Sequence, residues 1–298
     1  MSHVITLIGA PGAHDAVSEV AQDIKIAVGA AHDPVWLSRE ACDITFGPKD
    51  DSALEEAQDA LDAIPDSAPI DRLIQPIEGR RKRMLVADMD STIIQQECLD
   101  EVAVAAGMGA KIAAITERAM RGELVFEEAL RERIGLLRGF PQEKLQEVLD
   151  EQIQLTPGAR ELVNTMRVQG GHTVLVSGGF TFFTSAIAKR VGFDIDHANR
   201  FLFDDGALIG AAEPIVGPDA KVETMRAEAI KAGFGLKEVI AVGDGANDLD
   251  MLKAAGLGVA YHAKPILAAG AKARIDHGDL TALLFLQGYR SQEFVTDL

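Results

Sequence analysis

The chain has 298 residues, 47% of them apolar, which is enough to bury a large core and to form two domains. Its formal net charge of -17 argues against binding to nucleic acid or to anionic membranes, because both favour a basic protein surface. Its two cysteines lack C-x-x-C spacing, which excludes a disulfide framework, and the chain has neither a signal-peptide pattern nor a long apolar run, so we expect a cytoplasmic protein.

The first 78 residues have the pattern of a small α+β domain. Apolar spacing predicts strands at 4–9, 35–37, 41–46 and 70–74, and helices at 15–28 and 53–64. Ser52 is the expected cap of the second helix. This β-α-β-β-α-β order is that of a ferredoxin-like sandwich, and in order and length it resembles the ACT domains that sense amino acids. A plain packing or dimerisation domain is the alternative, including a homodimer formed through these residues.

The apolar segment 84–87 predicts a buried strand, and the basic run Arg80-Arg81-Lys82-Arg83 precedes it. We interpret this run as a solvent-exposed entry to the strand rather than a nucleic-acid patch. The strand delivers Asp88 and Asp90 beyond its carboxyl end, where ligands bind in parallel α/β sheets. Two carboxylates this close repel each other unless a cation or a shared proton intervenes. Taken alone, the pair fits a capped turn equally well.

Helical patterns then continue for about sixty residues. They predict helices at 96–106, 109–122, 125–138 and 141–152. A helical insertion placed directly after the first catalytic strand can cover the carboxyl end of the sheet as a lid. We therefore predict two domains, 1–78 and 79–298, and a helical cap at about 96–153 within the second.

After the insertion, strands and helices alternate as in a doubly wound parallel sheet. The apolar runs predict strands at 172–176, 239–242 and 258–260, a hairpin at Asp205-Gly206, and helices that include 181–191, 249–255 and 280–287. Polar residues follow two of these strands: Ser177-Gly178-Gly179 and Gly243-Asp244-Gly245-Ala246-Asn247-Asp248. Lys221 lies in the first turn of the helix that begins at Pro218.

The ends of three strands should converge in such a sheet, and together they predict a phosphate site. Four carboxylates in one cleft, those of Asp88, Asp90, Asp244 and Asp248, require a hard divalent cation, and Mg²⁺ suits oxygen ligands. The Lys221 ammonium and the N–H groups after Val176 suit a phosphate. The set predicts metal-assisted phosphoryl transfer with a carboxylate available as nucleophile. Singly, each residue also fits a turn or a solvated helix position, and Asn247 could be a turn residue.

These motifs resemble those of the haloacid dehalogenase superfamily of phosphatases and, within it, the phosphoserine phosphatase family, over about residues 83–290. The resemblance implies that Asp88 is the nucleophile, that Asp90 is the general acid and base, and that Thr92 orients their loop. It implies that Asp88, the backbone carbonyl of Asp90, and Asp244 hold Mg²⁺, with Asp248 positioning the waters of the metal. The residues implied to bind the phosphoryl group are Ser177, Gly178, Lys221 and Asn247.

The same resemblance points to the cap for substrate choice. It implies that Glu97 meets a substrate ammonium, that Arg133 takes a carboxylate, and that Met120 and Phe126 wall the site. The alternative for Glu97 and Arg133 is ordinary helix-surface charge, and Arg131 competes for the role of Arg133. The expected reaction is hydrolysis of O-phospho-L-serine, a small phosphorylated amino acid, at the last step of serine biosynthesis. Phosphoglycolate, phosphohomoserine or a sugar phosphate is the alternative substrate, and a non-catalytic amino-acid-sensing or aspartyl-phosphate module is the alternative class.

Overall fold

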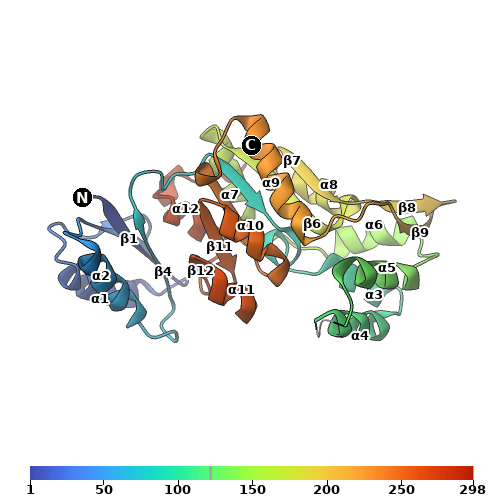
Figure 1. Cartoon of the computed structure of the whole chain (residues 1–298), viewed down its shortest axis with the longest axis horizontal. Coiled ribbons are helices and arrows are strands. Elements are labelled where there is room, and N and C mark those ends of the chain that lie inside the picture. Colours follow the sequence, from blue (N-terminus) through green and yellow to red (C-terminus); the bar gives the residue numbers. More distant parts are fainter. Residues whose placement is uncertain (121–122, 298) are drawn as a thin grey trace.

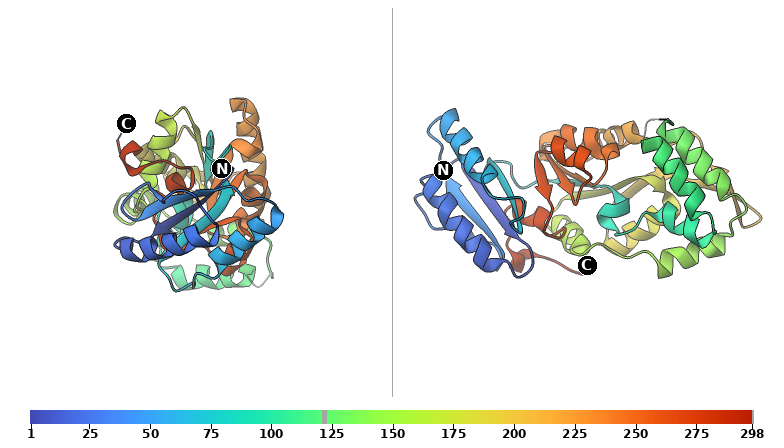
Figure 2. Two further views of the ribbon diagram at one scale, coloured as in Figure 1. Left: turned by 90° about the vertical axis from the view of Figure 1, so that its left-hand side faces the viewer. Right: turned by 90° about the horizontal axis from the view of Figure 1, so that it is seen from below.

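The computed structural model describes residues 1–120 and 123–297, and only the backbone of Met120. The molecule is elongated, with an N-terminal domain at one end, a parallel sheet in the middle, and a helical cap with a β-hairpin at the other end (Figure 1). The view from below shows the same order of parts (Figure 2). None of the helices in these described ranges combines the length and the hydrophobicity needed to cross a membrane.

The N-terminal domain is an antiparallel sheet with two helices on one face. Its elements are β1 (His3–Gly9), α1 (His14–Ala27), β2 (Val35–Trp36), β3 (Ala41–Phe46), α2 (Asp51–Asp62) and β4 (Ile70–Pro76). The strand order β2-β3-β1-β4 is that of a ferredoxin-like sandwich, as expected. The prediction that Ser52 caps α2 is wrong. The Asp50 carboxylate is the cap, because it stands three residues before Ala53 and accepts a 3.0 Å hydrogen bond from the Ala53 N–H.

Both faces of this sheet are buried, each against a different partner. Successive residues of a strand point to opposite faces. In β1, Ile5 and Leu7 pack in a core with α1 and α2, whereas Ile8 belongs to the large core of the rest of the chain, together with Leu73 of β4. The second face of the sheet therefore docks on the central domain and fixes the two parts against each other.

Arg80 also stabilises this interface, which corrects the interpretation of the basic run. Its guanidinium donates to the Asp43 carboxylate at 2.7 and 3.1 Å, and the two side chains are only 11% and 9% exposed. It donates further to the backbone carbonyl groups of Phe285 and Leu286, both at 3.2 Å. Arg80 is therefore a buried link between the two domains and not part of a solvated strand entry.

The central sheet has six parallel strands, which confirms the predicted α/β fold class. In spatial order they are β12 (Ala273–Ile275), β11 (Leu257–Tyr261), β10 (Val239–Gly243), β5 (Met84–Ala87), β6 (His172–Phe180) and β7 (Ile195–Asn199). In β5, Met84 and Val86 face one core and Leu85 and Ala87 face another. A strand that is buried on both faces has a continuous apolar sequence, which is why β5 could be predicted.

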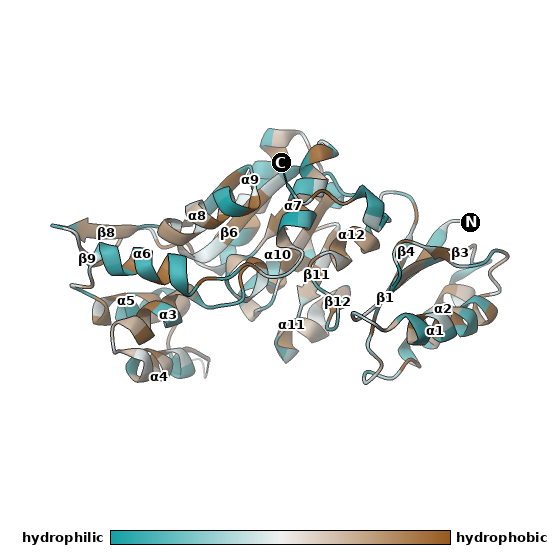
Figure 3. Cartoon of the chain, turned by 180° about the vertical axis from the view of Figure 1, so that it is seen from behind, coloured by the Kyte–Doolittle hydropathy of each residue, from teal (hydrophilic) through white to brown (hydrophobic). Residues whose placement is uncertain are grey.

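Helices cover both faces of the central sheet. One face packs against α9 (Pro218–Ala232), α10 (Leu249–Ala254) and α11 (Pro265–Gly270), and the other against α7 (Ala159–Val168), α8 (Thr181–Val191) and α12 (Ala282–Leu286). Helices α1, α6 and α9 carry both hydrophilic and hydrophobic residues, as expected for helices that turn one side toward a core (Figure 3).

The cap consists of four helices close to the predicted positions. They are α3 (Cys98–Ala105), α4 (Gly109–Met120), α5 (Phe126–Leu136) and α6 (Gln142–Glu151). Residues 121–122, the predicted end of the second cap helix, lie outside the described residues. The predicted hairpin, β8 (Phe201–Asp204) and β9 (Ala207–Ala211), holds the cap: the Gly139 N–H donates to the Leu208 carbonyl at 2.7 Å and the Leu208 N–H donates to the Phe140 carbonyl at 2.9 Å.

Candidate active site

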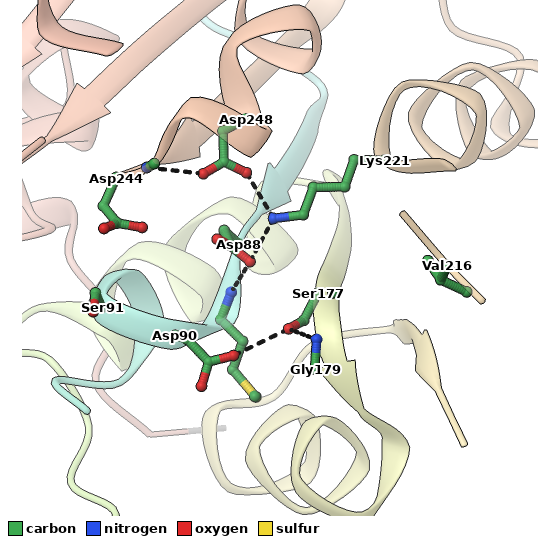
Figure 4. Close-up of polar contacts among 12 residues, drawn as sticks. Asp88, Asp90, Ser91, Ser177, Gly179, Val216, Lys221, Asp244 and Asp248 are labelled. Atoms are coloured by element: carbon green, nitrogen blue, oxygen red, sulfur yellow. Dashed lines mark hydrogen bonds and ion pairs between the residues drawn. The ribbon is translucent and has the colours of Figure 1, made fainter. Parts of the chain in front are cut away.

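Three adjacent strands of the central sheet bring polar groups to one edge. The strands β10, β5 and β6 are neighbours in that order. Asp244 and Asp88 follow the first two, and Ser177 lies near the end of the third. These three side chains line one cavity of about 360 Å³, and residues of the cap form part of its wall. The predicted convergence of the strand ends therefore occurs, and Figure 4 shows the side chains around it.

Lys221 reaches this edge from the first turn of α9 and lies between two carboxylates. Its Nζ atom is 2.8 Å from Asp88 Oδ1 and 2.7 Å from Asp248 Oδ1, and the side chain is 1% exposed. Burial by itself lowers the pKa of Lys221, but the charges of Asp248 and Asp88 outweigh it and raise the pKa above its ordinary value. Burial, with the charge of Asp248, raises the pKa of Asp88 well above its ordinary value, although Lys221 opposes this. The buried ammonium thus compensates part of the negative charge.

The carboxylates of Asp88, Asp244 and Asp248 form a compact group of oxygen atoms. All three residues are buried, and each offers one oxygen within 4.8 Å of the others. Gly243 permits this packing, because a side chain at that position would overlap Asp248. Three buried carboxylates beside one ammonium retain excess negative charge, and a hard divalent cation suits this set of donors. The Asp90 carboxylate is not in this group.

Asp90 is held in a different environment from Asp88. Its Oδ1 accepts a 2.8 Å hydrogen bond from the Cys98 N–H, and its Oδ2 accepts a 3.2 Å hydrogen bond from the Ser177 hydroxyl. Burial and the charge of Glu97 raise the pKa of Asp90 to about 6. A carboxyl group with that pKa exchanges a proton readily near neutral pH, as a general acid and base must.

Ser177 and Gly178 lie where a phosphoryl group could approach the backbone. The Ser177 hydroxyl accepts a 2.8 Å hydrogen bond from the Gly179 N–H. A Cβ atom at Gly178 would lie 2.9 Å from the Phe126 ring, so glycine is needed for the cap to approach this closely. The buried Asn199 fixes the loop by donating to the Gly178 carbonyl at 2.9 Å and by accepting from the Val216 N–H at 2.6 Å.

Opposite charges line the cap side of the cavity. Glu97, Phe126 and Arg133 all contribute to its wall. The Arg133 Nε atom is buried and has no hydrogen-bond partner among the described residues. Arg131, the competing candidate, does not line the cavity. It forms a bidentate pair with Glu213 at 2.9 and 3.2 Å, and its side chain is half-exposed.

The remaining predicted residues have different placements. Asn247 lines the cavity. The side chain of Met120 lies outside the described residues. Thr92 is fully buried, and its hydroxyl has no hydrogen-bond partner in the part of the chain that the structure describes.

Lys264, which was not among the predicted site residues, also lines the cavity. It follows β11, the strand beside β10, and its Nζ lies 3.4 Å from Asp244 Oδ2. The sequence feature that could have identified Lys264 is that it is a basic residue shortly after the strand predicted at 258–260.

The chain belongs to the haloacid dehalogenase-like hydrolase family, whose profile matches residues 85–253, more than half of its length. A crystal structure of a family hydrolase from Salmonella enterica serovar Typhi is similar over 96% of this chain and 98% of that chain, with 30% identity and a TM-score of 0.85.

Among named relatives, the chain is similar to phosphoserine phosphatases. It is 45% identical to the phosphoserine phosphatase of Haemophilus influenzae over 204 residues, which cover 68% of this chain and 65% of that protein. A substrate-bound phosphoserine phosphatase structure covers 69% of this chain and 98% of its own, with 37% identity and a TM-score of 0.64. The chain spans between 51% and 65% of the length of the first four curated relatives that it matches.

Proposed function

We propose that this protein is a Mg²⁺-dependent phosphoserine phosphatase that hydrolyses O-phospho-L-serine through an aspartyl-phosphate. The observation that carries the proposal is the cavity itself. It combines a buried carboxylate group beside Lys221 with a wall that presents Glu97 and Arg133, whose buried Nε atom has no hydrogen-bond partner among the described residues. The names of the relatives support the same substrate. This activity would place the enzyme in the cytoplasm, at the last step of serine biosynthesis.

Asp88 and Asp90 would divide the chemistry between them. An Asp88 oxygen attacks phosphorus, the bond from phosphorus to the serine oxygen breaks, and Asp90 gives its proton to the departing alkoxide. Asp90 then takes a proton from water, which attacks phosphorus, releases phosphate and restores the Asp88 carboxylate. The pKa of Asp90, raised to about 6, suits both steps.

The other residues would neutralise and orient the phosphoryl group. Lys221, Ser177 and the Gly178 N–H suit its oxygens, and Asn247 lies on the same cavity. Asp88, Asp244 and the backbone carbonyl of Asp90, with Asp248 beside them, would hold a Mg²⁺ ion, which supplies charge neutralisation at the phosphoryl oxygens.

The wall of the cavity fits a zwitterion beside the phosphate. Glu97 would receive the substrate ammonium, and Arg133 would receive the carboxylate, a pairing that suits the planar guanidinium. A buried guanidinium nitrogen without a partner is unfavourable, so an anionic ligand there would satisfy it. Phe126 would close the apolar side.

The test is phosphate release from O-phospho-L-serine with and without Mg²⁺, beside phosphoglycolate, phosphothreonine and an aryl phosphate. We expect kcat/KM for phosphoserine to exceed that for the others by about a hundredfold, or roughly 2.7 kcal/mol, and to be lost on chelation. Activity on the aryl phosphate alone would keep the chemistry and overturn the substrate. Stoichiometric labelling by phosphate analogues without turnover would favour a non-catalytic module.

We also propose that residues 1–78 form a separate domain that can mediate a homodimer. One face of its sheet is occupied by the central domain, so the dimer would use the edge at β2, where Val35 and Trp36 are exposed. Light scattering of wild type and Trp36→Glu tests this, and a monomer in both cases would refute it.

A further inference from the structure

Asp71 connects the N-terminal domain to a loop of the central domain. It lies on β4 and is 4% exposed. Its Oδ1 accepts a 2.7 Å hydrogen bond from the Asp276 N–H, and its Oδ2 accepts one of 2.7 Å from the Gly278 N–H. The His277 N–H lies 3.2 Å from both oxygens. One buried carboxylate from another domain therefore fixes three consecutive residues of this loop.

Gly278, which Asp71 holds, also contacts His262. The Gly278 carbonyl lies 2.9 Å from His262 Nε2, and the His262 N–H donates to the Ile275 carbonyl at 2.8 Å. His262 has a φ of +42°, in the left-handed region that a residue with a Cβ adopts at a cost. Such a conformation persists only where the surroundings hold it. The loop that Asp71 fixes supplies that hold.

The backbone conformation of His262 in turn determines the position of Lys264. Two residues further on, the Lys264 N–H donates to the Asp244 carbonyl at 3.0 Å, and the ammonium lies 3.4 Å from Asp244 Oδ2. Asp244 belongs to the group of carboxylates that suits a divalent cation. The ammonium and such a cation carry charge of the same sign and share one carboxylate, so each weakens binding of the other. The Lys264 side chain is 60% exposed, which leaves it free to move away.

We propose that Lys264 lowers the affinity of the active site for divalent cations, and that Asp71 is a positioning residue that holds Lys264 there through Gly278 and His262. The inference rests on the proposed metal site. The loop has room to relax when Asp71 is lost, because Asp71, Asp276 and His277 border a cavity of about 400 Å³ between the two domains. Through Asp71, the N-terminal domain thereby affects the affinity of the metal site for cations.

The experiment measures Mn²⁺ binding to the full-length protein by electron paramagnetic resonance of free Mn²⁺, which needs no turnover. Lys264→Gln should bind Mn²⁺ about three- to tenfold more tightly than wild type, because a positive charge leaves a half-exposed position beside Asp244. Asp71→Asn, which replaces an acceptor with a donor facing N–H groups, should tighten binding in the same direction. The double variant should bind no more tightly than Lys264→Gln, since both changes act on one residue.

Asp43→Asn is the matched control, because it also loses a buried contact between the domains but touches Arg80 and not the loop. Its Mn²⁺ affinity should stay within about twofold of wild type. Equal tightening in Asp43→Asn and Asp71→Asn, or additive effects in the double variant, would overturn the relay.

If Asp71→Asn does not fold, His262→Ala breaks the same chain from the other side and carries the same expectation. If the wild type binds Mn²⁺ and Asp244→Asn still binds it, the metal site is overturned together with this inference. Binding that is lost in Asp244→Asn but unchanged in Lys264→Gln overturns this inference alone.

Discussion

Replacing Arg133 with methionine removes a partly buried cation from the cavity and keeps most of its side-chain volume. In the structure the Arg133 Nε atom is buried without a partner in the described part of the chain. A substrate carboxylate would give the guanidinium two charge-assisted hydrogen bonds, and removing one partner of such a buried pair costs about 3–4 kcal/mol. At about 1.4 kcal/mol for each factor of ten, kcat/KM for phosphoserine should fall by roughly 10²- to 10³-fold.

The assay compares two substrates and two variants. An aryl phosphate lacks the carboxylate, so Arg133→Met should lower its kcat/KM by less than about threefold. Arg131→Met is the matched control on the same helix, because Arg131 is half-exposed and already paired with Glu213. It should stay within about twofold of wild type on both substrates. Equal losses on phosphoserine and on the aryl phosphate would refute the assignment of Arg133 to the carboxylate.

Three further perturbations address the chemistry and the domain interface. Asp88→Asn should lower phosphate release by about 10⁴-fold or more, because the amide cannot act as the nucleophile. Mass spectrometry of acid-quenched enzyme should show a phosphorylated form of the wild type only. Near-normal turnover of the variant would exclude the covalent step. Chelation of divalent metal should abolish activity and added Mg²⁺ should restore it, whereas activity that survives chelation would overturn the metal proposal. Arg80→Met leaves the Asp43 carboxylate buried without its guanidinium partner, while the Thr6 hydroxyl still donates to it. Denaturant titration should therefore show a loss of about 3 kcal/mol in the free energy of unfolding, against less than about 1 kcal/mol for Arg81→Met, whose pair with Glu293 is partly exposed. Equal losses would remove Arg80 from the interface.

The central strands could be predicted because both of their faces are buried. Their sequences are short apolar runs, and the polar residues that follow them stand out. The edge strands were missed for the complementary reason. In β7, four of five residues are only partly buried, and β12 has three residues, so neither produces a clear pattern. Asp88 and Asp244 follow central strands, Ser177 lies near the end of one, and Lys221 lies in the first turn of a helix that packs on the sheet, which is why their positions could be predicted.

Residues whose roles depend on a distant partner could not be predicted in this way. Arg80 belongs to a basic run that is ordinary in sequence, and its burial depends on Asp43, 37 residues earlier. Ser52 and Asp50 both fit the pattern of a helix cap, and only the backbone decides between them. Local patterns determine which residues can take a position, whereas the packing of distant segments determines which of them does.

Lys264 shows how far the packing of distant segments extends into the active site. It stands after a strand of the same sheet as Asp88 and Asp244, yet no motif marks it. Its place near Asp244 depends on the unusual backbone of His262, which depends on Gly278. Gly278 depends in turn on Asp71, which stands 207 residues before it. The residues that carry out a reaction can therefore be predicted from local sequence, while those that adjust their charge depend on how the two domains dock. In this protein the docked face of the N-terminal sheet, through Asp71, is where such adjustment should be sought.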